Sequence, residues 1–283
     1  MNENKINKNI YSTIFSTEKN IVMGILNVTK DSFYDGGRYN TSKKIINQAK
    51  KMLDEGATII DIGAQSSRPG AKQITSENEL KILIPVVKLL KKTFPNITLS
   101  IDTFWSETAN KCVALGADMI NDISAGNIDS NMLATIAKIN KPYVLMHMQG
   151  TPKNMQTNPT YGNIIAEIKD FFEEKIQQLN DFGFNKIILD PGFGFGKTIK
   201  DNYKLINYLN EFNQFNYPIL VGLSRKSMIY NLFNSSADDA LNGTSILNTI
   251  AIQKGARILR VHDCKEAYEC IKISEYMNNL INS

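Results

Sequence analysis

Short apolar segments alternate with longer segments of helical periodicity along most of the chain. Each apolar segment has four to six residues and is rich in Ile, Leu and Val, a composition typical of buried strands. Eight of them occur, each followed by a segment that favours a helix. The predicted strands are Ile21–Leu26, Thr58–Ile62, Thr98–Asp102, Met119–Ile123, Tyr143–Met146, Ile187–Asp190, Ile219–Gly222 and Ile258–Val261.

The intervening segments carry the apolar spacing and the start signals of amphipathic helices. Ser76 followed by Glu79 matches a capping box, which predicts a helix start there. The clearest stripe has apolar residues at the three- and four-residue spacing that lines one face of a helix. Its members are Tyr161, Ile164, Ile165, Ile168, Phe171, Phe172, Ile176 and Leu179.

Eight strand-then-helix units without a linker or a break in composition favour one domain over two. They predict an α/β protein with the (β/α)8 barrel (TIM barrel) fold in a single domain over residues 21–283. A doubly wound sheet is the alternative. Residues 1–20 precede the first unit, and we expect this extension to cap the closed end of the barrel.

Polar residues lie at or just after the end of almost every predicted strand. In a (β/α)8 barrel these strand ends meet on one face, which carries the active site. The alternation therefore predicts a shared polar mouth. Its candidate residues are Asn27, Asp61, Asp102, Asn121, His147, Asp190, Ser224, Arg225, Lys226, Arg260 and His262.

Composition narrows the class of partner. The 283 residues are 42% hydrophobic and 21% charged, and the net charge of +4 comes from scattered Lys and Arg without a basic run. We therefore expect no nucleic-acid partner and no membrane partner, and an anionic small substrate fits better. The longest apolar stretches are too short to span a membrane, and the N-terminus lacks the features of a signal peptide, which predicts a cytoplasmic protein. Three cysteines without a C-x-x-C pair disfavour a disulfide framework.

Two loops are rich in oxygen donors or anion-binding groups. Residues 27–37 offer several side-chain oxygens for a hard cation, although an ordinary turn cluster would have the same composition. Residues 64–70 combine hydroxyls with Arg68, whose guanidinium can hold two phosphate oxygens at once, and a solvated loop is the alternative.

Three polar residues end three different predicted strands and can converge on one ligand. Asp102, Asn121 and Asp190 together would suit a ring with several N–H donors, such as an aminopyrimidinone. A single buried Asp is usually structural, but three at one barrel mouth favour binding.

The segment from Asp190 to Thr198 alternates Gly with Phe. Pro191 stands where a phosphate-binding P-loop needs glycine, so this segment is not a P-loop. Gly194 lets the backbone approach a planar ligand while Phe195 covers its face. A rim turn with core phenylalanines is the alternative.

The last two strands end in cations. Residues 224–227, Ser-Arg-Lys-Ser, begin a helix, and Arg260 and His262 share one face of the last strand. This quarter of the barrel commonly binds phosphate, so we expect an anion clamp here. His147 and Trp105 are assigned mainly to packing.

Taken together, these motifs closely resemble the dihydropteroate synthase family of pterin-binding barrel enzymes, and the match covers almost the whole chain in the family's order. The motifs are MGILNVTKDSFYDGG (23–37), IDIGAQSSRPGA (60–71), SIDT (100–103), IND (120–122), LMHMQGTP (145–152), LDPGFGFGK (189–197), VGLSRKS (221–227) and RVHD (260–263). The resemblance implies condensation of 6-hydroxymethyl-7,8-dihydropterin diphosphate with 4-aminobenzoate to 7,8-dihydropteroate, assisted by Mg²⁺. It also implies a homodimer.

The resemblance assigns roles to individual residues. It makes Asn27 the Mg²⁺ ligand, and it makes Asp102, Lys226, Arg260 and His262 catalytic. The pterin would be held by Asp102, Asn121, Met146, Asp190 and Lys226, the diphosphate by Arg68, Arg260 and His262, and the aminobenzoate by Ser67, Pro69, Phe195 and Ser227. Gly194 is also expected to bind substrate.

Departures from the family pattern are few. Lys30 replaces the usual proline, Ala64 a glycine and Ser67 a threonine, which bears on inhibitor sensitivity more than on activity. A pterin-dependent methyltransferase is the nearest rival but has no use for Arg68, Arg260 and His262 as a diphosphate clamp. A non-catalytic pterin-binding relative would have lost loop residues, whereas Asn27 and Arg68 are both present.

Overall fold

A computed structural model describes residues 11–15, 19–28, 38–65 and 73–281. Its strands form one closed parallel barrel in chain order, so the predicted (β/α)8 fold is confirmed. The strands are β1 (Ile21–Asn27), β2 (Ile59–Gly63), β3 (Leu99–Asp102), β4 (Met119–Asp122), β5 (Tyr143–Met146), β6 (Ile187–Asp190), β7 (Ile219–Val221) and β8 (Ala256–Val261). Most predicted strand boundaries agree with these within one residue.

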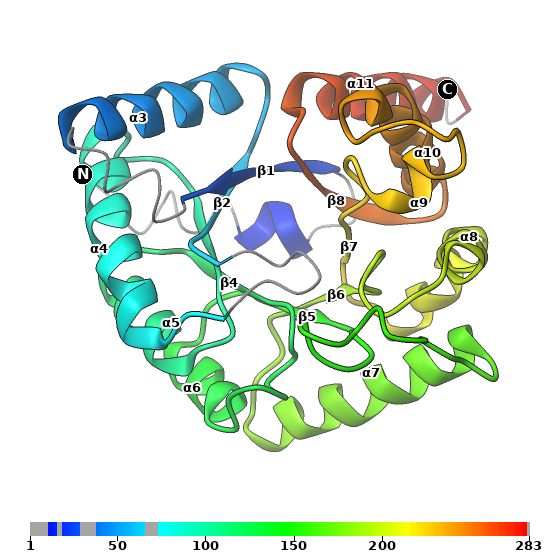
Figure 1. Cartoon of the computed structure of the whole chain (residues 1–283), viewed down its shortest axis with the longest axis horizontal. Coiled ribbons are helices and arrows are strands. Elements are labelled where there is room, and N and C mark those ends of the chain that lie inside the picture. The colour runs from blue at the N-terminus through cyan, green and yellow to red at the C-terminus, as the bar shows by residue number, and fades with distance from the viewer. Residues whose placement is uncertain (1–10, 16–18, 29–37, 66–72, 282–283) are drawn as a thin grey trace.

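Helices form a ring outside the barrel (Figure 1). They are α3 (Arg38–Asp54), α4 (Ser76–Thr93), α5 (Ser106–Ala114), α6 (Met132–Ile139), α7 (Ile164–Asp181), α8 (Ile199–Asn207), α9 (Ser227–Tyr230), α10 (Leu241–Gln253) and α11 (Cys264–Ile281), with the 3-10 turns η1 (Leu209–Phe215) and η2 (Asp238–Ala240). The predicted stripe on α7 buries Ile164, Ile168, Phe172 and Leu179.

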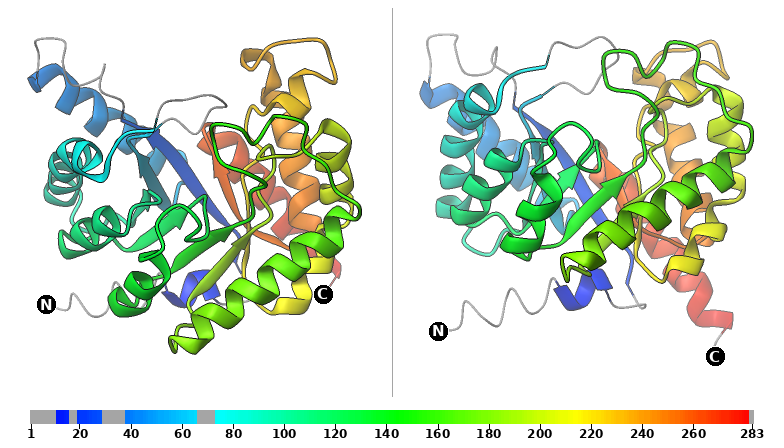
Figure 2. Two further views of the ribbon diagram at one scale, coloured as in Figure 1. Left: turned by 60° about the horizontal axis from the view of Figure 1, so that its bottom comes forward. Right: turned by 90° about the horizontal axis from the view of Figure 1, so that it is seen from below.

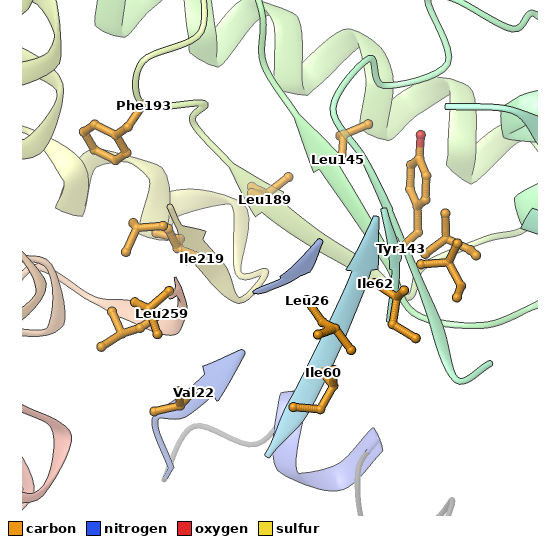
Figure 3. Close-up of a cluster of buried hydrophobic side chains, with 14 of the residues drawn as sticks. Val22, Leu26, Ile60, Ile62, Tyr143, Leu145, Leu189, Phe193, Ile219 and Leu259 are labelled. Atoms are coloured by element: carbon orange, nitrogen blue, oxygen red, sulfur yellow. The ribbon is translucent and has the colours of Figure 1, made fainter. Parts of the chain in front are cut away.

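Side chains alternate between the barrel interior and the helix layer, as parallel strands with both faces covered require. On β2, for example, Ile60 and Ile62 belong to the core beneath the helices, whereas Ile59 belongs to the interior cluster. Figure 3 shows this outer core, in which residues of many strands meet the helices.

The barrel interior is apolar at one end and polar at the other. The apolar end, which we call the floor, contains Ile14, Ile21, Met23, Ile59, Met119, Val144, Ile188, Leu220 and Ile258. Ile14 comes from the helical segment 11–15, which lies across this end of the barrel (Figure 2). On four of these strands the next inward position is polar, namely Asp61, Asn121, Asp190 and Arg260, so the floor supports a largely polar mouth above it.

The start of α4 differs from the prediction by one residue. Thr75, not Ser76, is the N-cap, and its hydroxyl accepts a hydrogen bond from the Asn78 N–H. Glu79 is fully buried and accepts a 2.6 Å hydrogen bond from Thr103 at the end of β3, so it makes no capping box with Ser76.

Cys112, Cys264 and Cys270 are buried free thiols. In the ranges that the structure covers, no helix has the length and apolar character needed to cross a bilayer.

Candidate active site at the mouth of the barrel

Neighbouring strands bring their last inward residues to one level. Gly63 on β2 is in register with Asp102 on β3, and Asp102 is in register with Asn121 on β4. Further round the barrel, Met146 on β5 is in register with Asp190 on β6. The structure therefore brings the predicted ring-binding residues to a common mouth.

Arg260 on β8 reaches across this level to two carboxylates. Its Nε donates to Asp61 Oδ2 at 2.7 Å, and its Nη2 donates to Asp102 Oδ2 at 2.6 Å. The guanidinium is thus held by carboxylates, and its approach to an anion would use Nη1 or require the Asp102 contact to break.

Asp61 joins the same network from two residues deeper in β2 than Gly63. Besides the Arg260 contact, its Oδ2 accepts a 2.9 Å hydrogen bond from the Asn121 amide. Asp61 is 0% exposed, and its Oδ1 has no hydrogen-bond partner among the described residues.

The electrostatics of the mouth leave Asp102 balanced between its two protonation states near neutral pH. Burial raises the pKa of Asp102 to about 7, against the opposing effect of Arg260 and with a further contribution from Asp61. Burial also opposes the charge of Arg260, but Asp61 and Asp102 outweigh it and raise the Arg260 pKa, so the guanidinium stays charged.

Lys226 folds over the Gly-Phe segment that follows β6. Its ammonium donates to the Phe193 carbonyl and lies 4.5 Å from the centre of the Phe195 ring. A Cβ on Gly194 would come within 2.9 Å of the Lys226 side chain, and Gly194 has a φ of +78°, so glycine is required there. Burial lowers the pKa of Lys226 to about 8, while Asp190 favours its charged form.

Asp190 is fixed by the same segment. Its Oδ1 accepts a 2.8 Å hydrogen bond from the Gly192 N–H, and burial raises its pKa although Lys226 opposes this. An acceptor therefore faces the mouth beside a cation.

A second buried lysine holds the segment from behind. Lys197 Nζ donates to the carbonyls of Gly192 at 2.9 Å and Phe195 at 3.1 Å, and lies 3.0 Å from His147 Nδ1. Burial lowers the pKa of Lys197 to about 7 and that of His147 well below its usual value. His147 was assigned to packing, and in the structure it also contacts this lysine.

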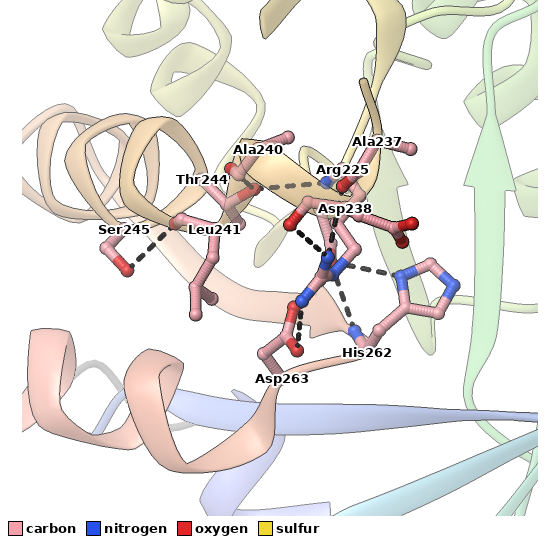
Figure 4. A network of polar contacts seen from close by, with 10 residues as sticks. Arg225, Ala237, Asp238, Ala240, Leu241, Thr244, Ser245, His262 and Asp263 are labelled. Carbon is pink, nitrogen blue, oxygen red and sulfur yellow. Dashed lines mark hydrogen bonds and ion pairs between the residues drawn. The ribbon is translucent and has the colours of Figure 1, made fainter. Parts of the chain in front are cut away.

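The two cationic side chains expected to lie together after β7, Arg225 and Lys226, have different partners and point in different directions. Arg225 is turned outward to Asp263, with contacts of 2.8 and 2.9 Å, and to the carbonyls of Ala237 and Asp238 (Figure 4). It therefore ties the loop together and is not available as an anion-binding group, which corrects the expectation. Lys226 alone of this pair faces the mouth.

His262 lies at the rim. Ser224 Oγ is 3.0 Å from its Nδ1 and accepts from its backbone N–H at 3.2 Å. Partial desolvation and the nearby Arg260 lower the pKa of His262, which favours the neutral ring.

An apolar wall completes the mouth. Met146 packs in a cluster with Phe104 and Ile123, and Phe195 lies against that cluster. Acceptors at Asp102, Asn121 and Asp190, a donor at Lys226 and this wall suit a flat, nitrogen-rich ring that offers several N–H groups.

Comparison with known proteins gives the same picture. Residues 23–262 match the family model described as pterin binding enzyme. The dihydropteroate synthase of Escherichia coli K12 is 44% identical over 256 residues, which is 90% of each chain. That of Synechocystis is 40% identical over 261 residues, covering 91% of this chain and 90% of the relative. The chain belongs to the dihydropteroate synthase family.

Solved structures of dihydropteroate synthases superpose on almost the whole chain. A Yersinia pestis dihydropteroate synthase with a sulfonamide drug has a TM-score of 0.87 and 42% identity, covering 93% of this chain and 96% of its own. A Xanthomonas albilineans dihydropteroate synthase with 4-aminobenzoic acid has a TM-score of 0.85 and 36% identity, covering 93% of this chain and 94% of its own.

Not all the expected synthase residues fall within the described structure. Ser67, Arg68 and Pro69 lie outside it, as do residues 29–37 of the first loop. Asn27 ends β1 and is exposed, and Ser227 is exposed as the first residue of α9. Both are therefore accessible from solvent.

Asp61 is the polar residue at the mouth to which the sequence assigned no specific role. It lies two positions before Gly63, and Ile59, two positions earlier again, is in the interior cluster. Counting alternate positions back from the strand end would have placed Asp61 inside the barrel, below Asp102 and Asn121.

Proposed function

We propose that the chain condenses 6-hydroxymethyl-7,8-dihydropterin diphosphate with 4-aminobenzoate, giving 7,8-dihydropteroate and diphosphate. One observation carries this proposal: Asp102, Asn121 and Asp190 share a barrel mouth with Lys226, in a chain of this family. The pterin offers N–H donors for the three acceptors and a carbonyl for the lysine. Met146 and Phe195, which lie in and against one apolar cluster, would pack on its faces.

In the reaction, the carbon–oxygen bond to diphosphate breaks, a bond to the aniline nitrogen forms, and that nitrogen then releases one proton to solvent. The aniline nitrogen is already a nucleophile, so no covalent protein intermediate is needed. As diphosphate leaves, the pterin methylene carbon becomes electron-poor. The ionised carboxylate of Asp102 would stabilise that charge, an interaction that strengthens only in the transition state.

The leaving diphosphate needs cations. Arg260 near the end of β8 and His262 just after that strand would contact it, together with Arg68. Mg²⁺ would be held by the Asn27 amide oxygen and by the diphosphate itself, and when bound it would neutralise charge on the leaving group.

The donor set fits such a loosely held cation. In the part of the chain that the structure describes, no group of three or more His, Cys, Asp or Glu side chains is arranged to hold a metal. A hard ion with an amide oxygen from Asn27 and phosphate oxygens from the substrate needs no such cluster.

A homodimer belongs to the same proposal. The outer helix α11 exposes Ile273, Tyr276, Met277 and Leu280, each at least 50% accessible. Their spacing puts them on one stripe of the helix, and a second copy of the chain would cover it.

The deciding experiment is a coupled assay of diphosphate release. We expect release that requires both substrates and Mg²⁺, and formation of dihydropteroate in equal amount. Release without 4-aminobenzoate would show a hydrolase, and full turnover with excess chelator would exclude the metal role. A methyltransferase would show transfer from methyltetrahydrofolate and no diphosphate release.

A further inference from the structure

We infer that Asp61 is a positioning residue that fixes how Asn121 and Arg260 face the substrate. The inference rests on the proposed function, because the ligand concerned is the pterin. Asp61 does not need to touch the pterin for this role, since it acts through two hydrogen bonds to residues that line the mouth.

The two hydrogen bonds share one oxygen. Asn121 Nδ2 at 2.9 Å and Arg260 Nε at 2.7 Å both donate to Asp61 Oδ2. Asp61 Oδ2 is therefore the acceptor in both contacts. The Asn121 amide must then turn its NH₂ inward, which leaves its carbonyl oxygen Oδ1 for a ligand.

This orientation sets the hydrogen-bond pattern of the mouth. With Oδ1 available, Asn121 offers an acceptor between the carboxylates of Asp102 and Asp190, and the site then selects a ring edge made of donors. If the Asn121 amide could flip freely, it would at times present its NH₂ to the ligand, and this donor would repel a ring edge made of N–H groups. Asp61 therefore determines ligand specificity indirectly, through the orientation of the Asn121 amide.

Arg260 is held by the same carboxylate. Nε is bound to Asp61 and Nη2 to Asp102, so the guanidinium plane is fixed by contacts to β2 and β3. When a bound ligand displaces Arg260 from Asp102, the contact with Asp61 still holds Arg260 in the mouth. The side chain is 17% exposed, and moving it elsewhere would leave the buried Asp61 without its cationic partner.

The test compares two substitutions of similar volume. Asp61→Asn keeps an acceptor oxygen for both donors, whereas Asp61→Leu removes it. We expect Asp61→Leu to weaken the binding of 6-hydroxymethylpterin, measured by calorimetry, by about tenfold or more, the loss typical of one buried hydrogen bond. Asp61→Asn should stay within about threefold of the original chain, a difference of less than 1 kcal/mol.

Ser100→Ala is the matched control. Ser100 is the strand neighbour of Asp61, is buried, and its hydroxyl has no hydrogen-bond partner among the described residues. Its substitution changes the same layer of the barrel without touching Asn121 or Arg260, and pterin binding should be unchanged. The KM for 4-aminobenzoate should change less than the KM for the pterin diphosphate in both Asp61 variants.

Equal losses in the Asn and Leu variants would overturn the inference, as would full pterin affinity in Asp61→Leu. Thermal unfolding of each variant shows whether it is folded. If Asp61→Leu does not fold, Asp61→Asn decides: retained binding supports the inference, and a tenfold loss in a folded protein refutes it. Failure of the original chain to bind the pterin would instead refute the proposed function.

Discussion

At the scale of single residues, the mouth is governed by the burial of charge. The carboxyl groups of Asp61, Glu79 and Asp122 are each close enough to raise the pKa of Asp102, and Arg260 contacts both Asp61 and Asp102. Burial is the largest influence on Asp102 and exceeds the effect of the 2.6 Å contact with Arg260. Its carboxyl group therefore titrates near the pH at which it would work.

This balance predicts a pH dependence. Asp102 has a pKa raised to about 7, so the ionised form that the proposed mechanism uses is in the minority below that pH and predominates above it. We expect kcat/KM for the pterin diphosphate to rise with pH through about 7 and to fall above about 8, where Lys226 loses its proton. Steady-state rates from pH 5.5 to about 9.5 measure both limbs.

Asp102→Asn is the control for this prediction. It should lower kcat much more than it weakens binding of the pterin alcohol, and its residual activity should lack the rise through pH 7, since its side chain does not titrate. An unchanged acid limb in this variant would assign the titration to another group.

At the scale of elements, the segment 192–197 depends on a buried lysine for its shape. Lys197 is 3% exposed and donates to two carbonyls of this segment, while Lys226 donates to a third. The backbone that carries Phe195 is thus held from both sides.

Lys197→Met should therefore destabilise the fold by about 1–3 kcal/mol, because it leaves buried carbonyls without donors.

Lys197 also predicts a pH dependence of stability. Its pKa is lowered to about 7 in the folded protein, so between pH 7 and the ordinary pKa of a lysine its side chain is protonated in the unfolded chain but not in the folded one. This makes the free energy of unfolding rise with pH over that range. The rise should be smaller in the variant. Urea unfolding at two pH values measures it, with the exposed Lys200→Met as control.

The start of α4 gives a second prediction at this scale. Thr75→Ala removes the N-cap hydroxyl and should cost about 0.5–2 kcal/mol of stability, whereas Ser76→Ala should cost little, because the Ser76 hydroxyl donates to Glu107 on the exposed surface. Thermal unfolding of the two variants distinguishes them. A larger loss of stability in Ser76→Ala than in Thr75→Ala would show that Ser76 is the N-cap.

These elements also show what can be read from a sequence. The strands were predictable because their apolar runs are short and regularly spaced, and the strand ends followed from them. The cap was misplaced because Thr75 and Ser76 offer the same hydroxyl. The partners of Arg260 and Arg225 were not predictable, since Asp61 is 199 residues from Arg260 and Asp263 is 38 from Arg225. Such contacts depend on the closed barrel, and no local pattern marks them.

At the scale of the whole molecule, the candidate site and the proposed dimer surface lie on different parts of the protein. The mouth lies at the carboxyl ends of the strands, and the apolar stripe of α11 lies on the outer ring of helices (Figure 1). Substitutions on the stripe can therefore change the oligomeric state without touching Asp102, Asn121 or Asp190.

We predict that light scattering gives a mass of two chains for the original protein and of one chain for a variant with Ile273→Glu and Met277→Lys. Both side chains are at least half exposed, so the isolated chain should remain folded. Phe182→Glu is the control, because Phe182 is 54% exposed and lies outside the stripe. A single-chain mass for the original protein would refute the dimer.

The floor of the barrel has a consequence for the chemistry above it. Ile14 and the inward residues of the strands separate the buried carboxylates from water on that side of the molecule. By excluding water these residues keep the local dielectric low, and a low dielectric strengthens the interactions between charges in the mouth. Ile14, near the start of the described chain, thus helps to strengthen the charge interactions of Asp102 and Arg260 from the opposite end of the barrel.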